Sequence, residues 1–314
     1  MTSATLYDVP APAKLNLFLH VVGRRADGYH LLQTVFRFID LADSLHFERR
    51  ADGAIERAYD LPGVAPQDDL IVRAARALQQ ATGTSHGARI GLVKRIPQGG
   101  GLGGGSSDAA TTLIALNRLW STGLSRRELM ALALPLGADV PVFVFGQPAF
   151  AQGVGDELAA VALPEAGYLV AQPDASVPTA AIFGASDLTR DTKPIKISDF
   201  LAHPRAGFGK NDLEPVAFAR YPEIFRCRMW LEARLAVLAA TALAAMAPAR
   251  MSGSGACLFV EFATQARALL AQQEITATMR VAAGSKTHGT APEFRLIQAC
   301  AGLAEHPLWH WIAS

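Results

Sequence analysis

A run of glycine interrupts this 314-residue chain: six of the seven residues from Gly99 to Gly105 are glycine, in the order GGGLGGG. Ordering a glycine inside a regular element costs roughly 0.5–1 kcal/mol more than ordering an alanine. The segment ARIGLVKRIP before the run has the pattern of a strand that ends at Pro97, and SSDAATTLIALNRLW after it has the pattern of a helix. Ordered elements on both sides argue against a flexible spacer and favour a loop whose backbone another group approaches closely.

Two familiar phosphate-binding patterns do not account for the run. Gly99, Gly101 and Gly104 satisfy G-x-G-x-x-G, but a glycine run matches that spacing trivially, and no acidic strand end follows about 20 residues later, as a dinucleotide-binding fold requires. No Gly-Lys-Ser/Thr closes the run, which excludes the usual P-loop. The helix predicted to begin at Ser106 would turn its free N–H groups and the positive end of its dipole toward the loop. The loop is therefore predicted to bind a phosphate chain, with serine hydroxyls beside phosphate oxygens or a magnesium ion.

The composition excludes several classes of protein. Hydrophobic residues make up 50% of the chain, charged residues 18%, and the formal net charge is +1, so the chain is globular and lacks the basic field that recruits nucleic acid or acidic membranes. Cys227, Cys257 and Cys300 are widely spaced, which predicts free thiols in a reducing compartment. The apolar run from Leu235 to Ala249 is shorter than the roughly 20 residues that span a bilayer and predicts a buried helix. With no secretory pattern at its start, we expect a cytoplasmic protein, monomer or weak homodimer, without nucleic-acid or membrane partners.

Strand and helix patterns are mixed along the chain without strict alternation, which favours an α+β fold over a doubly wound sheet. The segment AKLNLFLHVVG predicts a strand, LLQTVFRFIDLADSLHFERR predicts strand divided by a polar turn, and DVPVFVFG predicts a short strand. The segment DDLIVRAARALQQAT predicts a helix that Gly83 stops, and KNDLEPVAFARYPEIFRCRMWLEARLAVLAA has a helical pattern. We expect a domain boundary near Leu163, with a first domain of residues 1–163 and a second of residues 164–314.

Four segments carry a resemblance to one superfamily. The loop PQGGGLGGGSSDAA closely resembles the phosphate loop of the galactokinase, homoserine kinase, mevalonate kinase and phosphomevalonate kinase (GHMP) superfamily. PAKLNLFLHVVGRRADGYHLLQTVF resembles the N-terminal motif of the branch that phosphorylates a cytidine-diphosphate-linked sugar alcohol for isoprenoid synthesis. LGADVPVFVFGQPAFAQGVGDEL resembles the segment with that branch's catalytic aspartate, and MSGSGACLF resembles its third glycine motif. The four stand in the family's order and together cover most of residues 9 to 262, and the resemblance assigns no fold or role to residues 281–302.

The resemblance implies a two-domain GHMP-kinase fold with the active site in the cleft between the domains, and ATP as the phosphate donor. The carboxylates and histidines show no metal-ligand spacing, so no metal residue is assigned and Mg²⁺ would arrive with ATP. The residues implied to bind ATP are Lys94, Pro97, Gln98, Gly99, Gly100, Gly101, Leu102, Gly103, Gly104, Gly105, Ser106 and Ser107. Those implied to bind the sugar alcohol are Asn16, Tyr29, His30, Thr179 and Phe183. Asp69 stands where the family pattern leads us to expect an asparagine near the adenine.

A catalytic pair is expected at Lys14 and Asp139. Lys14 and Asn16 point to the same face of one strand, so both can reach a single pocket. Asp139 lies among apolar residues, where a carboxylate is normally paired or ligating. As ordinary structural residues, Lys14 would mark a strand edge and Asp139 a helix C-cap and turn. The resemblance instead implies that Asp139 is the base toward the substrate hydroxyl and that Lys14 keeps it ionised and oriented.

Two other functions compete with this hypothesis. A sister kinase would act on another small alcohol, and the GYH sequence and Phe183 argue against it. A nucleotide-binding protein without catalysis would serve as a regulator or scaffold, and the presence of both Lys14 and Asp139 argues against that.

Overall fold

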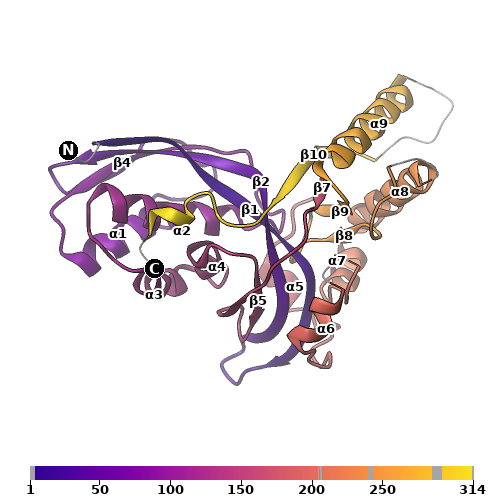
Figure 1. Ribbon diagram of the computed structural model, residues 1–314, viewed down its shortest axis with the longest axis horizontal. Coiled ribbons are helices and arrows are strands. Elements are labelled where there is room, and N and C mark those ends of the chain that lie inside the picture. The colour runs from indigo at the N-terminus through magenta and orange to yellow at the C-terminus, as the bar shows by residue number, and fades with distance from the viewer. Residues whose placement is uncertain (1–3, 204, 206, 240–242, 285–291, 313–314) are drawn as a thin grey trace.

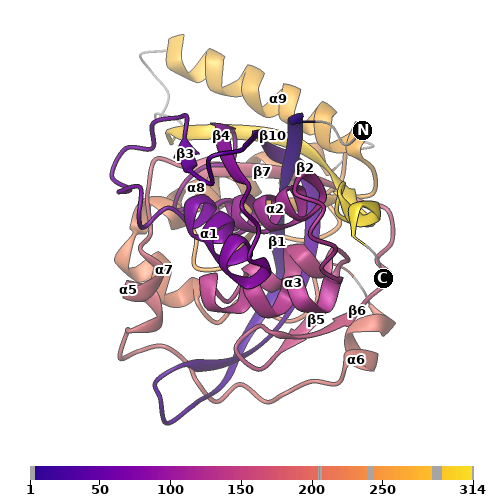
Figure 2. The same cartoon turned by 90° about the vertical axis from the view of Figure 1, so that its left-hand side faces the viewer.

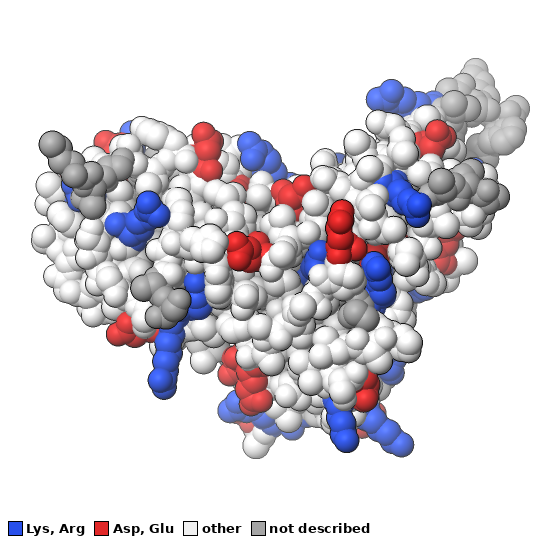
Figure 3. Space-filling view, viewed as in Figure 1, with Lys and Arg blue, Asp and Glu red and all other residues white. Residues whose placement is uncertain are grey.

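The computed structural model describes residues 4–203, 205, 207–239, 243–284 and 292–312 of the chain. On the face shown in Figure 3, charged side chains of both signs are scattered among uncharged ones, as the net charge of +1 leads us to expect. Among the described residues, no helix is long and apolar enough to cross a membrane.

Two long strands run through the molecule. β1 (Thr5–Arg24) and β2 (His30–Arg50) pair antiparallel from Thr5 opposite Glu48 to Arg24 opposite His30, and Figure 1 shows them running together from the upper left to the lower end of the molecule. The polar turn expected within β2 is therefore wrong. The ladder shifts register between Pro12 and Ala13, whose partners are Ala42 and Ile39, so the extra residues of β2 form a bulge. A bulge bends a strand without ending it, which explains why the polar residues there do not make a turn.

The remaining strands extend this pair into a ten-stranded sheet with the order β3-β4-β2-β10-β7-β9-β8. β1 and β5 also pair with β2, and β6 pairs with β5. Their bounds are β3 Ile55–Arg57, β4 Gly87–Val93, β5 Ala149–Gln152, β6 Glu157–Ala160, β7 Gly167–Pro173, β8 Arg250–Met251, β9 Leu258–Phe262 and β10 Phe294–Leu303. β10, in the part that sequence patterns left without an interpretation, pairs with β7 along most of its length and with β2 at Gly302 and Leu303.

Helices of the first half pack on one face of the long strands, and in Figure 2 they stand in front of β1 and β2. α2 is the central one, with twelve of its sixteen residues buried, in a core shared with α1, α4 and the strands. Gly83 ends α1 at φ 64°, as predicted, and the side chain of Asp69 caps the start of the helix. The bounds are α1 Leu70–Thr82, α2 Gly104–Leu119, α3 Arg126–Ala133 and α4 Val140–Phe145, with 3₁₀ turns η1 Leu134–Leu136 and η2 Trp309–Trp311.

The second half carries α5 Thr179–Phe183, α6 Ile197–Ala202, α7 Glu214–Arg220, α8 Pro222–Leu238 and α9 Gln265–Gly284. The long helical segment expected before the second glycine turn is confirmed as α7 and α8. The apolar run from residue 235 is not one buried helix: α8 ends at Leu238, and residues 240–242 lie outside the described part. Its side chains do not share one buried face, since Leu235 is buried while Val237 is 69% exposed.

The segment DVPVFVFG forms the short helix α4 and not the predicted strand. Valine and phenylalanine favour strands in general, but Pro141 in the first turn suits a helix start, and Gly146 ends α4 in the left-handed conformation at φ 78°. Burial of Val140, Val142 and Phe143 against the core provides the stabilisation that local preference does not.

Candidate active site

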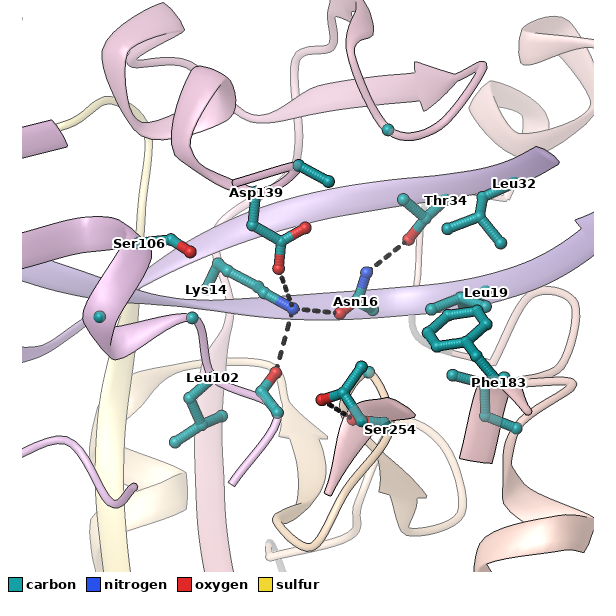
Figure 4. Close-up of a pocket in the computed structure, with 18 of the residues that line it drawn as sticks. Lys14, Asn16, Leu19, Leu32, Thr34, Leu102, Ser106, Asp139, Phe183 and Ser254 are labelled. Atoms are coloured by element: carbon teal, nitrogen blue, oxygen red, sulfur yellow. Dashed lines mark hydrogen bonds and ion pairs between the residues drawn. The ribbon is translucent and has the colours of Figure 1, made fainter. Parts of the chain in front are cut away.

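A pocket of about 860 Å³ opens where the glycine loop, β1, β2, α5 and the second glycine turn meet (Figure 4). Its lining includes every residue that the sequence assigned to the site except Ser107. Residues from both halves of the chain contribute, from Lys14 to Ser254. The boundary between residues 163 and 164 itself stays a prediction.

The glycine loop is held between β1 and the second glycine turn. The backbone N–H of Lys14 donates to the carbonyl of Leu102 at 3.0 Å, while Ala256 and Cys257 donate to the carbonyls of Gly99 and Gly100 at 3.1 Å. At Gly101 φ is 73°, and a Cβ there would stand 2.1 Å from the carbonyl oxygen of Ser252. Close packing of the glycine loop on the second glycine turn is therefore a second reason for glycine at position 101, beside the predicted approach of a phosphate chain. The sequence did not reveal this packing.

The helix that leaves the loop begins two residues earlier than predicted. α2 starts at Gly104 after the N-cap Gly103, which has φ 73° and provides no side-chain cap. The N–H groups of a first helical turn have no carbonyl four residues back, so those of Gly104, Gly105 and Ser106 are free for another acceptor. Ser106 lines the pocket. Ser107 does not: its side chain is fully buried, and its Oγ has no hydrogen-bond partner in the described part of the chain.

Lys14 is the centre of the polar network in Figure 4. Its Nζ donates to Asn16 Oδ1 at 2.6 Å and to the carbonyl of Gly101 at 3.0 Å, and lies 3.3 Å from Asp139 Oδ2. An ammonium group has three protons to donate, so these three acceptors hold the buried side chain in one position. Asp139 precedes α4 and is 37% exposed, so its carboxylate reaches the pocket while the lysine stays beneath it.

Thr34 and Ser252 extend this network, and sequence reasoning missed both. Asn16 Nδ2 donates to Thr34 Oγ1 at 2.9 Å, which fixes the orientation of the amide that accepts from Lys14. Ser252 Oγ donates to the carbonyl of Gly101 at 3.0 Å and accepts from the backbone N–H of Asn16 at 3.3 Å. Both residues are far from Lys14 in the sequence, so no local pattern connects them with it. The one available signal was that Thr34 follows the GYH segment on β2.

Lys94 stands at the start of α2 between two buried carboxylates. Its Nζ pairs with Asp43 and lies 2.8 Å from Asp108 Oδ2. Burial opposes the ammonium charge, but Asp108 and Asp43 outweigh it and raise the pKa of Lys94. Burial is the main cause that raises the pKa of Asp108, with Lys94 acting against it. Lys94 lines the pocket, yet its charge is already shared between two carboxylates that the sequence did not connect with it.

Aromatic and hydroxyl side chains form the opposite end of the pocket. The rings of His30 and Phe183 lie 5.1 Å apart between centroids and are tilted by 39°. Tyr29 lines the pocket but is 63% exposed. The aromatic ring next to Phe183 is therefore that of His30 and not that of Tyr29. Thr179 shares a 2.9 Å hydrogen bond with Ser254, another residue that sequence reasoning did not assign (Figure 4).

Asp69 lies outside the pocket lining. One carboxylate oxygen caps α1 by accepting from the N–H of Ile71, and the other accepts from Tyr59 and Arg57. The carboxylate in place of the expected asparagine is thus occupied in holding the helix start.

Known proteins are similar to this chain in sequence. The model of the GHMP kinases N terminal domain matches residues 69–147. The 4-diphosphocytidyl-2-C-methyl-D-erythritol kinase of Bordetella bronchiseptica is 73% identical over 99% of this chain and 100% of its own length. The enzyme of that name from Aromatoleum aromaticum is 60% identical over 83% of this chain and 86% of its own length.

Solved structures agree. A crystal structure of 4-(cytidine 5'-diphospho)-2C-methyl-D-erythritol kinase is 34% identical, with a TM-score of 0.71 over 93% of this chain and 97% of that one. A mevalonate kinase from L. major shares the fold at 14% identity, with a TM-score of 0.65 over 97% and 99% of the two chains. The fold and the glycine loop therefore define a GHMP kinase. Within that class, the chain belongs to the family of 4-diphosphocytidyl-2-C-methyl-D-erythritol kinases.

Proposed function

We propose that this protein transfers the γ-phosphate of ATP to the 2-hydroxyl of 4-diphosphocytidyl-2-C-methyl-D-erythritol, giving the 2-phosphate and ADP, in the non-mevalonate route to isoprenoid precursors. The observation that carries the proposal is the fixed contact of Lys14 with Asp139, Asn16 and the carbonyl of Gly101. It joins a cation and a carboxylate directly to the predicted phosphate loop. The full-length relatives carry the name of this kinase, which supports the choice of substrate.

The chemistry assigned to these residues is a phosphoryl transfer. As the 2-hydroxyl oxygen bonds to the γ-phosphorus, the bond from that phosphorus to the β–γ bridging oxygen breaks, and ADP leaves with the bonding electrons. The hydroxyl proton passes to the carboxylate of Asp139. Lys14 holds that carboxylate in place and keeps it ionised, because a neighbouring cation favours the charged form of an acid.

Phosphate binding is assigned to the backbone of Gly103 to Ser106. Free N–H groups at the start of α2 and the positive end of its dipole attract anions. For a magnesium ion, the oxygen donors that fit are the Ser106 hydroxyl and the Asp139 carboxylate, both at the pocket wall. When bound with ATP, such an ion neutralises charge on the β- and γ-phosphates.

Substrate binding is assigned to the other end of the pocket. Tyr29, His30 and Phe183 offer ring faces and polar edges to a cytosine, and Thr179 and Asn16 offer polar groups to the rest of the substrate. The site would then lie in a cleft between two domains, with the first holding ATP. We also propose a cytoplasmic monomer or weak homodimer that has no need of nucleic acid or a membrane.

Product analysis tests this function. Protein, magnesium ATP and 4-diphosphocytidyl-2-C-methyl-D-erythritol are mixed, and phosphorus NMR should detect a new phosphomonoester together with ADP. Equal turnover of homoserine or mevalonate would favour a sister kinase. Absence of any ATP turnover with the full panel of alcohols would favour a nucleotide-binding protein without catalysis.

A further inference from the structure

One arginine outside the pocket lining links the His30 ring to the backbone of Phe183, at the substrate end of the pocket. Arg190 lies between α5 and α6, and its Nε donates to His30 Nε2 on β2 at 3.0 Å. Its Nη2 donates to the carbonyls of Phe183 and Ala185 at 3.2 and 2.5 Å, and its Nη1 donates to the carbonyl of Leu188 at 3.0 Å. A single planar guanidinium thus joins a side chain of the first half of the chain to the end of the helix that carries Phe183.

This contact also determines the state of the imidazole. Since His30 Nε2 accepts a hydrogen bond, the neutral ring carries its proton on Nδ1. Burial, Arg190 and Arg24 lower the pKa of His30, in that order of importance, which keeps the ring neutral at physiological pH. The ring therefore has one donor in a known position and lies 5.1 Å from the ring of Phe183.

We infer that Arg190 is a positioning residue for the nucleobase end of the substrate: it holds His30 in the Nδ1–H tautomer and sets its ring beside Phe183. The inference rests on the proposed function, because it concerns how that substrate's base is received. A ring that is fixed before binding loses little freedom when the base arrives, so its loss weakens substrate binding and leaves the phosphate end unchanged.

The kinetic test compares two arginines that hold the same helix. Arg220 Nη1 donates to the carbonyl of Ala181 in α5 at 2.8 Å, and its Nη2 lies 3.7 Å from Asp187 Oδ1. Within the described part of the chain it forms no hydrogen bond with His30, so Arg220→Ala is the matched control. Arg190→Ala should raise the KM for the diphosphocytidyl substrate about tenfold, the equivalent of one hydrogen bond. The kcat and the KM for ATP should stay within about twofold of the parental values, a change well below the tenfold expected for a lost hydrogen bond. Arg220→Ala should change none of the three.

Two further variants separate positioning from charge. Arg190→Lys keeps the charge but lacks the planar fork that reaches the ring and the carbonyls together, so its substrate KM should stay raised. In a His30→Ala background, Arg190→Ala should add little, because the two act as a unit. An unchanged substrate KM in Arg190→Ala, an equal rise in both KM values, or full additivity with His30→Ala would each overturn the inference.

A measurement on the parent protein keeps the inference testable if Arg190→Ala does not fold. Nitrogen-15 NMR of the histidine rings, with His30→Gln to assign the signal, should show His30 protonated at Nδ1 at neutral pH. Protonation at Nε2, or an imidazolium at pH 7, would contradict it. If the parent turns over no diphosphocytidyl substrate, the proposed function fails, but this tautomer measurement still decides the role of Arg190.

Discussion

At the scale of single residues, the pair formed by Lys14 and Asp139 carries the chemistry. Asp139→Asn keeps the shape of the side chain and removes its charge, so kcat should fall by about 10²–10⁴, the usual worth of a positioned acid or base. Lys14→Ala should cost a similar factor, and the double variant should be little worse than either one. Steady-state kinetics checks this. Asp60→Asn, which removes a carboxylate 3.8 Å from Arg57 away from the pocket, should leave kcat unchanged. A kcat near that of the parent in Asp139→Asn would exclude it as the base.

The aromatic residues at the substrate end make a second prediction. Stacking of a base on an aromatic ring is worth roughly 1–3 kcal/mol, so Phe183→Ala should raise the substrate KM by about ten- to hundredfold. The KM for ATP should hardly change. Tyr29 is 63% exposed, so Tyr29→Ala should raise the substrate KM without a loss of thermal stability. If both variants melt earlier but keep the parental substrate KM, the rings only support the fold.

His306 links stability to pH. It is fully buried, its Nδ1 accepts from the N–H of Leu308, and burial lowers its pKa from 6.5 to about 3. As the pH falls, the imidazole of the unfolded chain is protonated before the buried imidazole of the folded chain. The stability that the neutral ring contributes is therefore fully present above pH 6.5 and is lost as the pH falls toward 3. Between pH 7 and pH 5 the free energy of unfolding should fall by about 2 kcal/mol more in the parent than in His306→Asn. Urea titrations of both proteins at pH 7 and pH 5 measure this difference. An equal change in the free energy of unfolding in the parent and in His306→Asn would contradict the prediction.

At the scale of elements, the glycine loop combines packing with the predicted phosphate site, and two positions separate these roles. A Cβ at Gly101 would meet the carbonyl oxygen of Ser252 at 2.1 Å, so Gly101→Ala should destabilise the protein. A Cβ at Gly105 would have only an ordinary contact of 3.7 Å with Leu70, and alanine suits a helix. Gly105→Ala should therefore keep the melting temperature and raise the KM for ATP severalfold. Unchanged ATP binding in this variant would remove the phosphate assignment from the start of α2.

At the scale of the whole molecule, the end of the chain returns to the first half. β10 pairs with β2 at its last two residues, and Leu308 and Ile312 lie in the core around α2. Arg126 stacks 3.7 Å from the ring of Trp309 and donates to its carbonyl. The core of the first half is thus completed by residues that follow the entire second half.

Truncating a side chain from the end of the chain measures how much this segment contributes to the stability of the core. Leu308→Ala should lower the free energy of unfolding by about 2–5 kcal/mol, the usual cost of a buried leucine truncated to alanine. Leu269, which is 47% exposed on α9, provides the control: Leu269→Ala should change stability by less than about 0.5 kcal/mol. Equal effects of the two substitutions in urea unfolding would show that the end of the chain contributes little.

Local chemistry explains what the sequence predicted well. The glycine run, the helix stop at Gly83 and the alternation that brings Lys14 and Asn16 to one face each depend on residues close together in the chain. The family resemblance added the assignment of Asp139, and the structure brings it within 3.3 Å of Lys14.

Features that depend on distant contacts were decided only by the tertiary structure. Burial against the core stabilises α4, whose strand-forming residues between Pro141 and Gly146 did not reveal a helix, and a bulge keeps β2 in one piece where polar residues predicted a turn. The carboxylates around Lys94 come from β2 and α2, and the donor to His30 comes from Arg190, 160 residues further along the chain. Free energy depends on which groups meet in space, and a local pattern contains no information on partners that only folding brings together.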